Sequence, residues 1–205
     1  MSNTEGSPLV AAYSGSMPFL VPFINASGSA CYANESGETL LHAAADGWQH
    51  RIIEFLILSG TIPNAQDNNG DTPLHKIVQS RELPCEGKFI LESDPFEART
   101  KTFSELLLRA ADRSIRNKQG ANPLHIAAWE GDVCAVKVLA GAKSLEDTTT
   151  RGATALALAV LNGHASCAEH LLLCGANHDF RFPSGGTILE TIRESDDWGM
   201  RKLAE

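Results

Sequence analysis

One motif returns along this chain of 205 residues at a nearly constant interval. Its clearest copies read Gly-Asp-Thr-Pro-Leu-His from Gly70 and Gly-Ala-Asn-Pro-Leu-His from Gly120, and related copies begin at Gly37 and Gly152. The first and last intervals are close to 33 residues, whereas the middle one is longer by about 17. Because a period of this length is typical of proteins whose similar units stack on one another, it constrains the fold more than any other feature.

The residue types within each copy predict a pair of helices. Thr72 suits the N-cap of a helix, and Pro73 suits the first helical position, where the missing N–H costs nothing. A second, leucine-rich segment closes each unit and ends at glycines such as Gly60 and Gly175, which favour the left-handed conformation at a helix C-terminus. The unit is therefore expected to be a helix-turn-helix followed by a hairpin-like turn.

With these residues in view, the chain resembles the ankyrin repeat family, whose signature is seen best from Asn122 to Ala127. The resemblance implies an all-α solenoid of stacked helix-turn-helix units with short β-hairpin-like connections, forming a single domain over residues 1–205. The expected parts are a degenerate N-terminal unit at 7–36, repeats at 37–69, 70–119, 120–151 and 152–184, and a C-terminal cap at 185–205.

Three features depart from this pattern. Pro22 falls inside the expected second helix of the first unit, so that helix should be short, kinked or absent. An insertion at about 82–98 separates the two helices of the second full repeat, and it is either a tolerated loop or an element specific to a partner. Trp48 stands where the family prefers glycine, with Gly47 one place earlier.

Composition and cysteine usage exclude several classes of function. The formal net charge is −8 and the sequence pI about 5.4, which opposes binding to nucleic acid. Five cysteines without a C-x-x-C pair suggest neither a disulfide framework nor a zinc site and fit a reducing compartment. The apolar run near Leu20 lacks a basic flank, so no signal peptide or membrane span is expected. We expect an intracellular monomer, cytoplasmic or nuclear.

No sequence pattern supports catalysis or a cofactor. Nucleotide-binding, zinc-protease and calcium motifs do not occur, and the resemblance assigns His42, His75 and His125 to hydrogen bonds at hairpins and helix starts. Cys167 and His170 could face each other on a helix, but nothing supplies a third group to orient them. We therefore expect no enzyme, no cofactor, no metal and no small-molecule substrate. The alternative is an enzyme or redox-responsive protein that uses the 82–98 insertion and Cys85.

The resemblance also implies where a ligand would be held, namely on the concave face made by hairpin tips and exposed positions of the first helices. Trp129 and Leu161 stand out there, because large apolar groups are unexpected at positions that the repeat leaves open. The candidate residues for binding a protein or peptide partner are Glu38, Asn69, Asp71, Lys118, Trp129, Glu130, Arg151, Leu161 and Asn162.

The predicted function is a non-enzymatic protein–protein interaction module that acts as an inhibitor, adaptor or scaffold. Three narrower roles fit such a surface: an inhibitor of a transcription factor in the style of the inhibitors of NF-kappa-B, a pathogen effector, or a substrate adaptor for ubiquitin ligation.

Overall fold

The computed structural model describes residues 7–27, 29–80, 95–141, 144–182, 185–195 and 198–203. The chain divides into two compact units, Met1–Asp112 and Arg113–Glu205. The prediction of a single domain over 1–205 stays a prediction. The helices of the first unit are α1 (Pro8–Ser14), α2 (Met17–Ser27), α3 (Leu40–Asp46), α4 (His50–Leu58), α5 (Pro73–Gln79) and α6 (Pro95–Leu108). Those of the second are α7 (Pro123–Glu130), α8 (Val133–Leu139), α9 (Ala155–Leu161), α10 (Ala165–Leu173), α11 (Ile188–Glu194) and α12 (Trp198–Lys202).

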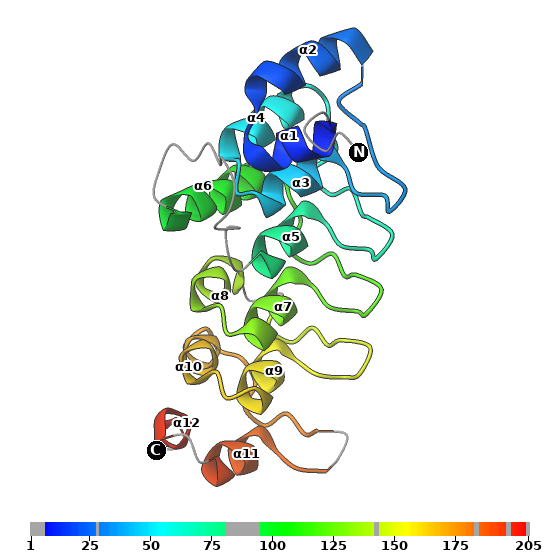
Figure 1. The fold of residues 1–205 in the computed structure, drawn as a ribbon. Helices are drawn as coiled ribbons and strands as arrows, with labels where there is room; N and C mark the ends of the chain where they lie inside the picture. The colour runs from blue at the N-terminus through cyan, green and yellow to red at the C-terminus, as the bar shows by residue number, and fades with distance from the viewer. Residues whose placement is uncertain are drawn as a thin grey trace, which may run out of the picture. The chain divides into compact units, whose positions relative to one another are not determined.

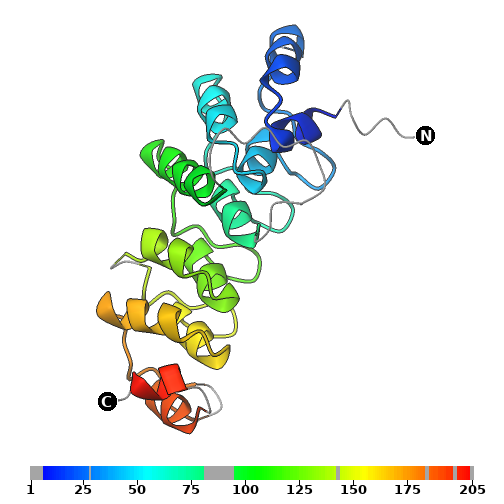
Figure 2. The ribbon, with the colours of Figure 1, turned by 60° about the vertical axis from the view of Figure 1, so that its left-hand side comes forward.

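Within each unit the helices form two rows. In the first unit α1, α3 and α5 pack in succession, and α2, α4 and α6 each pack against the first-row helix that precedes them in the chain (Figure 1). In the second unit α7, α9 and α11 make the first row, and α8, α10 and α12 make the second (Figure 2). Fully buried leucines and isoleucines fill the space between rows, among them Leu40, Ile53, Leu56, Leu74 and Leu106 in the first unit, and Leu124, Leu139, Leu156 and Leu171 in the second.

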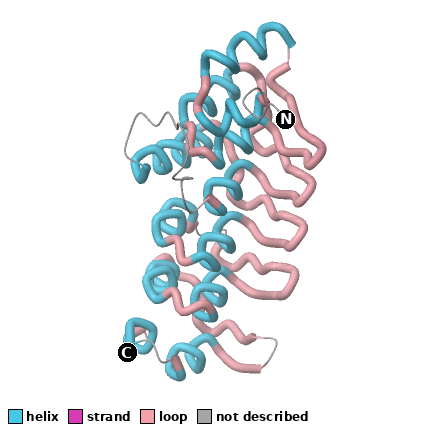
Figure 3. The backbone as a smooth tube through the Cα atoms, in the orientation of Figure 1, coloured by secondary structure: helices cyan, strands magenta, loops and turns pink. Residues whose placement is uncertain are grey.

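Loops connect each second helix to the next first helix as hairpins, and in each unit they project from the same side as the first-row helices (Figure 3). Among the described residues, strand pairing is limited to isolated bridges, Ala33 with Thr39 and Arg181 with Thr187, each directly before a first-row helix. The prediction of an all-α repeat fold is confirmed. None of the described helices combines the length and the apolar character that crossing a membrane requires.

The first-row helices begin at the motif position for which Thr72 predicts an N-cap. Thr39 and Asn122 accept hydrogen bonds from the backbone N–H of the residue three places on, at 3.4 and 3.0 Å. Thr72 has extended backbone angles at its N-cap, and Pro73 follows at the first helical position. These contacts satisfy N–H groups that have no partner inside the helix, which fixes where each unit starts.

Pro22 does not shorten or abolish its helix, so that part of the expectation is wrong. Helix α2 runs through Pro22 from Met17 to Ser27 and is longer than α1. Proline at this position lacks the N–H that would bond to the carbonyl of Pro18, but both prolines are exposed, so water can reach the carbonyl left without a partner.

The glycine that other repeats have at the position of Trp48 is found one place earlier, at Gly47, for a steric reason. A Cβ on residue 47 would overlap the carbonyl oxygen of Tyr13, so only glycine fits there. Trp48 then takes the left-handed conformation, with φ of 55°, that Gly131 and Gly163 adopt at the equivalent place. The indole is buried and lies 5.5 Å from the Arg99 guanidinium, which is also 5.5 Å from the Phe103 ring.

The final residues of the expected insertion belong to a helix. Residues 95–98 form the first turn of α6, whereas 82–94 lie outside the described residues. Arg99, one residue further along, donates two hydrogen bonds to the carbonyl of Ile77 at 3.3 and 3.2 Å. The chain that leaves the insertion is thus tied to the end of α5.

Ala110 occupies a backbone conformation that glycine prefers, which generates a stability prediction. Its φ is 64°, while Gly60 and Gly175 at the equivalent position have φ of 90°. Because a left-handed conformation costs a residue with a Cβ about 1 kcal/mol or more, Ala110→Gly should raise the free energy of unfolding by about 0.5–1 kcal/mol in urea denaturation followed by circular dichroism.

Gly60→Ala is the matched control. A Cβ there would meet no atom within 4 Å, so the substitution should lower stability by about 1 kcal/mol through the backbone alone. A less stable Ala110→Gly variant would contradict the argument.

Candidate protein-interaction surface

In each of the two compact units, a histidine joins one hairpin to the next. The Nδ1 atom of His42 accepts a hydrogen bond from the backbone N–H of Thr39 at 3.2 Å, and Nε2 donates to the carbonyl of Asp71 in the following hairpin at 2.9 Å. His125 repeats both contacts, with Asn122 at 3.2 Å and with the carbonyl of Asp147 at 2.9 Å. The role that the family resemblance implied for His42 and His125 is confirmed.

These contacts define the tautomer of His42. A backbone N–H can only donate and a carbonyl can only accept, so the proton of its neutral imidazole lies on Nε2. Desolvation by burial is the largest influence on the pKa of both His42 and His125, and it holds each pKa below its ordinary value. Both histidines are therefore neutral hydrogen-bonding groups at neutral pH.

Adjacent hairpin tips are joined by further hydrogen bonds. In the first unit Asn68 donates from its backbone N–H to the carbonyl of Ser36 and from its side chain to the carbonyl of Glu35, at 2.8 and 2.9 Å. In the second unit Thr150 donates to the carbonyl of Gln119 from both its N–H and its hydroxyl, at 3.1 and 2.9 Å. In each compact unit, these hydrogen bonds therefore hold two neighbouring hairpin tips at a fixed distance from each other.

The candidate residues at these tips differ in exposure. Asn69, Lys118 and Arg151 are exposed, and Glu38 is half-buried. Asp71 is only 5% exposed: its carboxylate accepts a hydrogen bond from Gln79 at 3.1 Å, and its N–H donates to Asp67. The expectation that Asp71 contacts a partner is therefore corrected, because this residue is used inside the unit.

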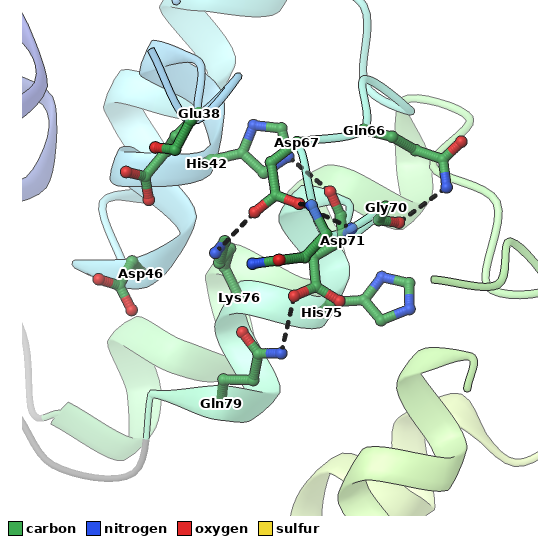
Figure 4. A network of polar contacts seen from close by, with 12 residues as sticks. Glu38, His42, Asp46, Gln66, Asp67, Gly70, Asp71, His75, Lys76 and Gln79 are labelled. Atoms are coloured by element: carbon green, nitrogen blue, oxygen red, sulfur yellow. Dashed lines mark hydrogen bonds and ion pairs between the residues drawn. The ribbon is translucent and has the colours of Figure 1, made fainter. Parts of the chain in front are cut away.

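Asp71 belongs to a polar network around Lys76 (Figure 4). The Nζ atom of Lys76 lies 3.0 Å from Oδ2 of Asp67, whose Oδ1 accepts from the N–H groups of Asn69 and Asp71 at 2.8 and 2.9 Å. Burial by itself would lower the pKa of Lys76, but the hydrogen bond and charge of Asp67, with Glu38 and Asp71, raise it above its ordinary value. The network therefore connects the hairpin, through Asp67, to Lys76 of helix α5.

Trp129 and Leu161 form the most apolar part of the candidate surface. They are the corresponding residues of α7 and α9, which pack against each other, and their exposed fractions are 52% and 55%. The equivalent residues of the first unit are Asp46 and Gln79, so only the second unit has large apolar side chains at this position. Glu130 and Asn162 follow the pair, half-buried and exposed respectively.

The backbone of Trp129 is hydrogen-bonded to the next repeat. Its carbonyl accepts a hydrogen bond from Nε2 of His164 at 2.9 Å, and a Cβ on Gly131 would lie only 2.6 Å from the same ring. Glycine at 131 is therefore needed for His164 to reach the end of α7. The indole projects from a fixed backbone, which reduces the entropy lost when a partner covers it.

Sequence reasoning missed a second set of exposed apolar residues. Leu58, Leu108 and Leu173 are the last residues of α4, α6 and α10, with exposed fractions of 70%, 82% and 79%. The signal was present in the closing motif, where each of these leucines follows two places after a leucine that is fully buried. The three residues lie on second-row helices, apart from the first-row positions of Trp129 and Leu161.

The cysteines and histidines are arranged differently from the expectation. Cys167 is buried, and desolvation, with smaller effects of Asp132 and Cys134, raises its pKa to about 11. The Nε2 atom of His170 instead lies 3.5 Å from Sγ of Cys174. Cys85 lies outside the described residues, and within the described part of the chain no three His, Cys, Asp or Glu side chains gather as a metal site.

The hairpins, paired helices and histidine contacts define a helical repeat protein of the hairpin–helix–helix class. The chain belongs to the ankyrin repeat family: the model of that family, described as ankyrin repeats in three copies, matches residues 9–95 and again 96–181.

Three curated proteins illustrate the similarity. Human NF-kappa-B inhibitor epsilon is 33% identical over 97 residues, which are 47% of this chain and 18% of that protein. Rat NF-kappa-B inhibitor alpha is 27% identical over 161 residues, with 73% of this chain and 46% of that protein covered. The mouse B-cell lymphoma 3 protein homolog is 28% identical over 160 residues, covering 77% and 33%. The chain thus spans less than half the length of each relative.

The two buried histidines generate a prediction on pH. The unfolded state binds protons near pH 6.5, whereas the folded state binds them only at lower pH, so stability is full above that range and falls as the pH decreases below it. Between pH 7.5 and 5.5, urea denaturation should show a loss of about 1–2 kcal/mol for the two residues together.

A His42→Gln, His125→Gln double variant tests the cause, because glutamine can complete the helix cap but does not titrate. It should be less stable overall and should lose most of the difference between the two pH values. His178→Gln, at an exposed histidine, is the control, and an equal effect from that variant would exclude the explanation.

The network around Lys76 generates a second prediction on stability. Lys76→Met removes the cation beside Asp67, whose side chain is only 4% exposed, and should lower the free energy of unfolding by about 2 kcal/mol. Adding Asp67→Asn should restore part of that loss, because an amide oxygen still accepts the two backbone hydrogen bonds.

Lys101→Met breaks an exposed ion pair with Glu97 and is the matched control, with an expected change within about 0.5 kcal/mol. Equal losses for the two lysine variants in the same denaturation assay would show that burial of the network contributes nothing.

Proposed function

We propose that the chain is a non-enzymatic, intracellular binding module that holds a protein or peptide partner on the face made by its hairpins and first-row helices. The observation that carries the proposal is the pair Trp129 and Leu161, two large apolar side chains more than half exposed at equivalent positions of adjacent helices. Exposed aromatic groups on a fixed backbone are frequent anchors in interfaces. Lys118, Glu130, Arg151 and Asn162 of the same unit are proposed to contribute polar contacts around this anchor, and Glu38 and Asn69 are proposed to contact the partner from the first unit.

The relatives support a narrower version of this proposal. Two are named as inhibitors of NF-kappa-B, and a mouse protein that is 36% identical over 73 residues is named RelA-associated inhibitor. We propose inhibition by occlusion as the mode of action, with a complex that contains RelA as the first partner to test. An adaptor or scaffold would use the same surface but would leave its partner active.

The experiment compares partners captured by the wild-type chain with those captured by a Trp129→Ala, Leu161→Ala variant, identified by affinity purification and mass spectrometry. Binding to each genuine partner should fall by about 30-fold or more, equivalent to roughly 2 kcal/mol. The matched control is Leu108→Ala with Leu173→Ala, which also removes two exposed leucine-sized groups but from second-row helices. Binding of purified RelA is measured with the same variants.

The outcomes separate the general proposal from the narrow one. In one outcome RelA fails to bind, while another protein binds to the wild-type chain and to the Leu108→Ala, Leu173→Ala control but not to the Trp129→Ala, Leu161→Ala variant. That result would contradict the proposed partner and support the proposed surface. If every partner survives the anchor variant undiminished, the proposed surface is wrong.

A further inference from the structure

A cysteine and a histidine meet at the end of α10, away from the surface proposed above. His170 lies in the last turn of the helix and Cys174 is its C-cap residue, with 3.5 Å between Nε2 and Sγ. Cys174 is exposed, so a reagent in solution can reach the sulfur atom. The ring nitrogen is near enough to accept a hydrogen bond from the thiol.

The other described cysteines lack this combination. Cys167 is buried among α8, α9 and α10 and is closed to reagents of any size. Cys31 and Cys134 are exposed, but among the hydrogen bonds within the described residues neither sulfur atom is joined to an imidazole. Exposure and a proton acceptor therefore coincide at Cys174 and not at the other three.

We propose that Cys174, with His170, is a site of reversible modification by small disulfides, which would leave a mixed disulfide at this position. The thiol proton passes from Sγ to Nε2 of His170, and the thiolate attacks one sulfur atom of the small disulfide. A bond forms between the two sulfur atoms as the original disulfide bond breaks, and the departing thiolate takes the proton back from the imidazolium. Cys174 is oxidised, the departing half of the disulfide is reduced, and His170 is regenerated.

The modification changes a defined part of the surface. Leu173, the residue before Cys174, is 79% exposed, and the hairpin that follows begins at Asn177, whose N–H donates to Glu146 at 2.9 Å. A bulky charged group such as glutathione at Cys174 would add charge directly after this exposed apolar residue. The modified and unmodified chains therefore differ in what the end of α10 offers to solvent.

The experiment treats the full folded chain with oxidised glutathione and follows each cysteine-containing peptide by mass spectrometry over time. Cys174 should form its mixed disulfide about fivefold or more faster than Cys31 and Cys134, which are internal controls in the same sample. Cys85 is followed as a separate peptide.

A His170→Gln variant isolates the contribution of the imidazole, because glutamine fits the same partly exposed site but is a far weaker base. Its Cys174 rate should fall to within about twofold of the two control cysteines, with an unchanged circular dichroism spectrum. Either of two results overturns the proposal: a wild-type Cys174 rate no higher than the controls, or a fast rate that His170→Gln leaves unchanged.

Discussion

Within each compact unit, the stacking of consecutive repeats depends on one histidine side chain that forms hydrogen bonds with both of its ring nitrogens. An imidazole at the third position of a first-row helix accepts from the N-cap of its own helix and donates to a carbonyl of the next hairpin, as His42 and His125 do. A short α-helix is unstable alone, and a hairpin without a sheet has few partners for its backbone. Because the same ring joins these two weak elements, neither the helix start nor the hairpin can move without the other.

The repeat in the sequence predicted the elements that have a local cause. The N-cap at Thr72, and glycines at the ends of second helices, follow from residue preferences that act over a few positions. Features that depend on distant neighbours were not predictable in this way. Asp71 looks like an exposed tip residue, and only the folded unit reveals that Gln79 and Lys76 lie beside it.

The candidate interaction surface, too, was predictable only where the repeat pattern itself carries the signal. Trp129 and Leu161 could be found from the sequence because the repeat marks their position as open, and both are more than half exposed. The apolar ends of α4, α6 and α10 were passed over, because leucine in a leucine-rich helix is ordinarily counted as core. Trp48 could be marked as irregular, but its cause lies in the backbone of Tyr13, which no periodicity in the sequence encodes.

The contact of Arg99 with Trp48 and Phe103 links two departures from the family pattern. A tryptophan in place of glycine and a long insertion look unrelated in the sequence, yet the arginine that covers the indole arrives with the chain that leaves the insertion. The guanidinium therefore lies against two aromatic rings, and its hydrogen bonds to the carbonyl of Ile77 join this stack to α5. A change at Trp48 would alter the setting of an arginine that is 51 positions further along the chain and that also bonds to α5.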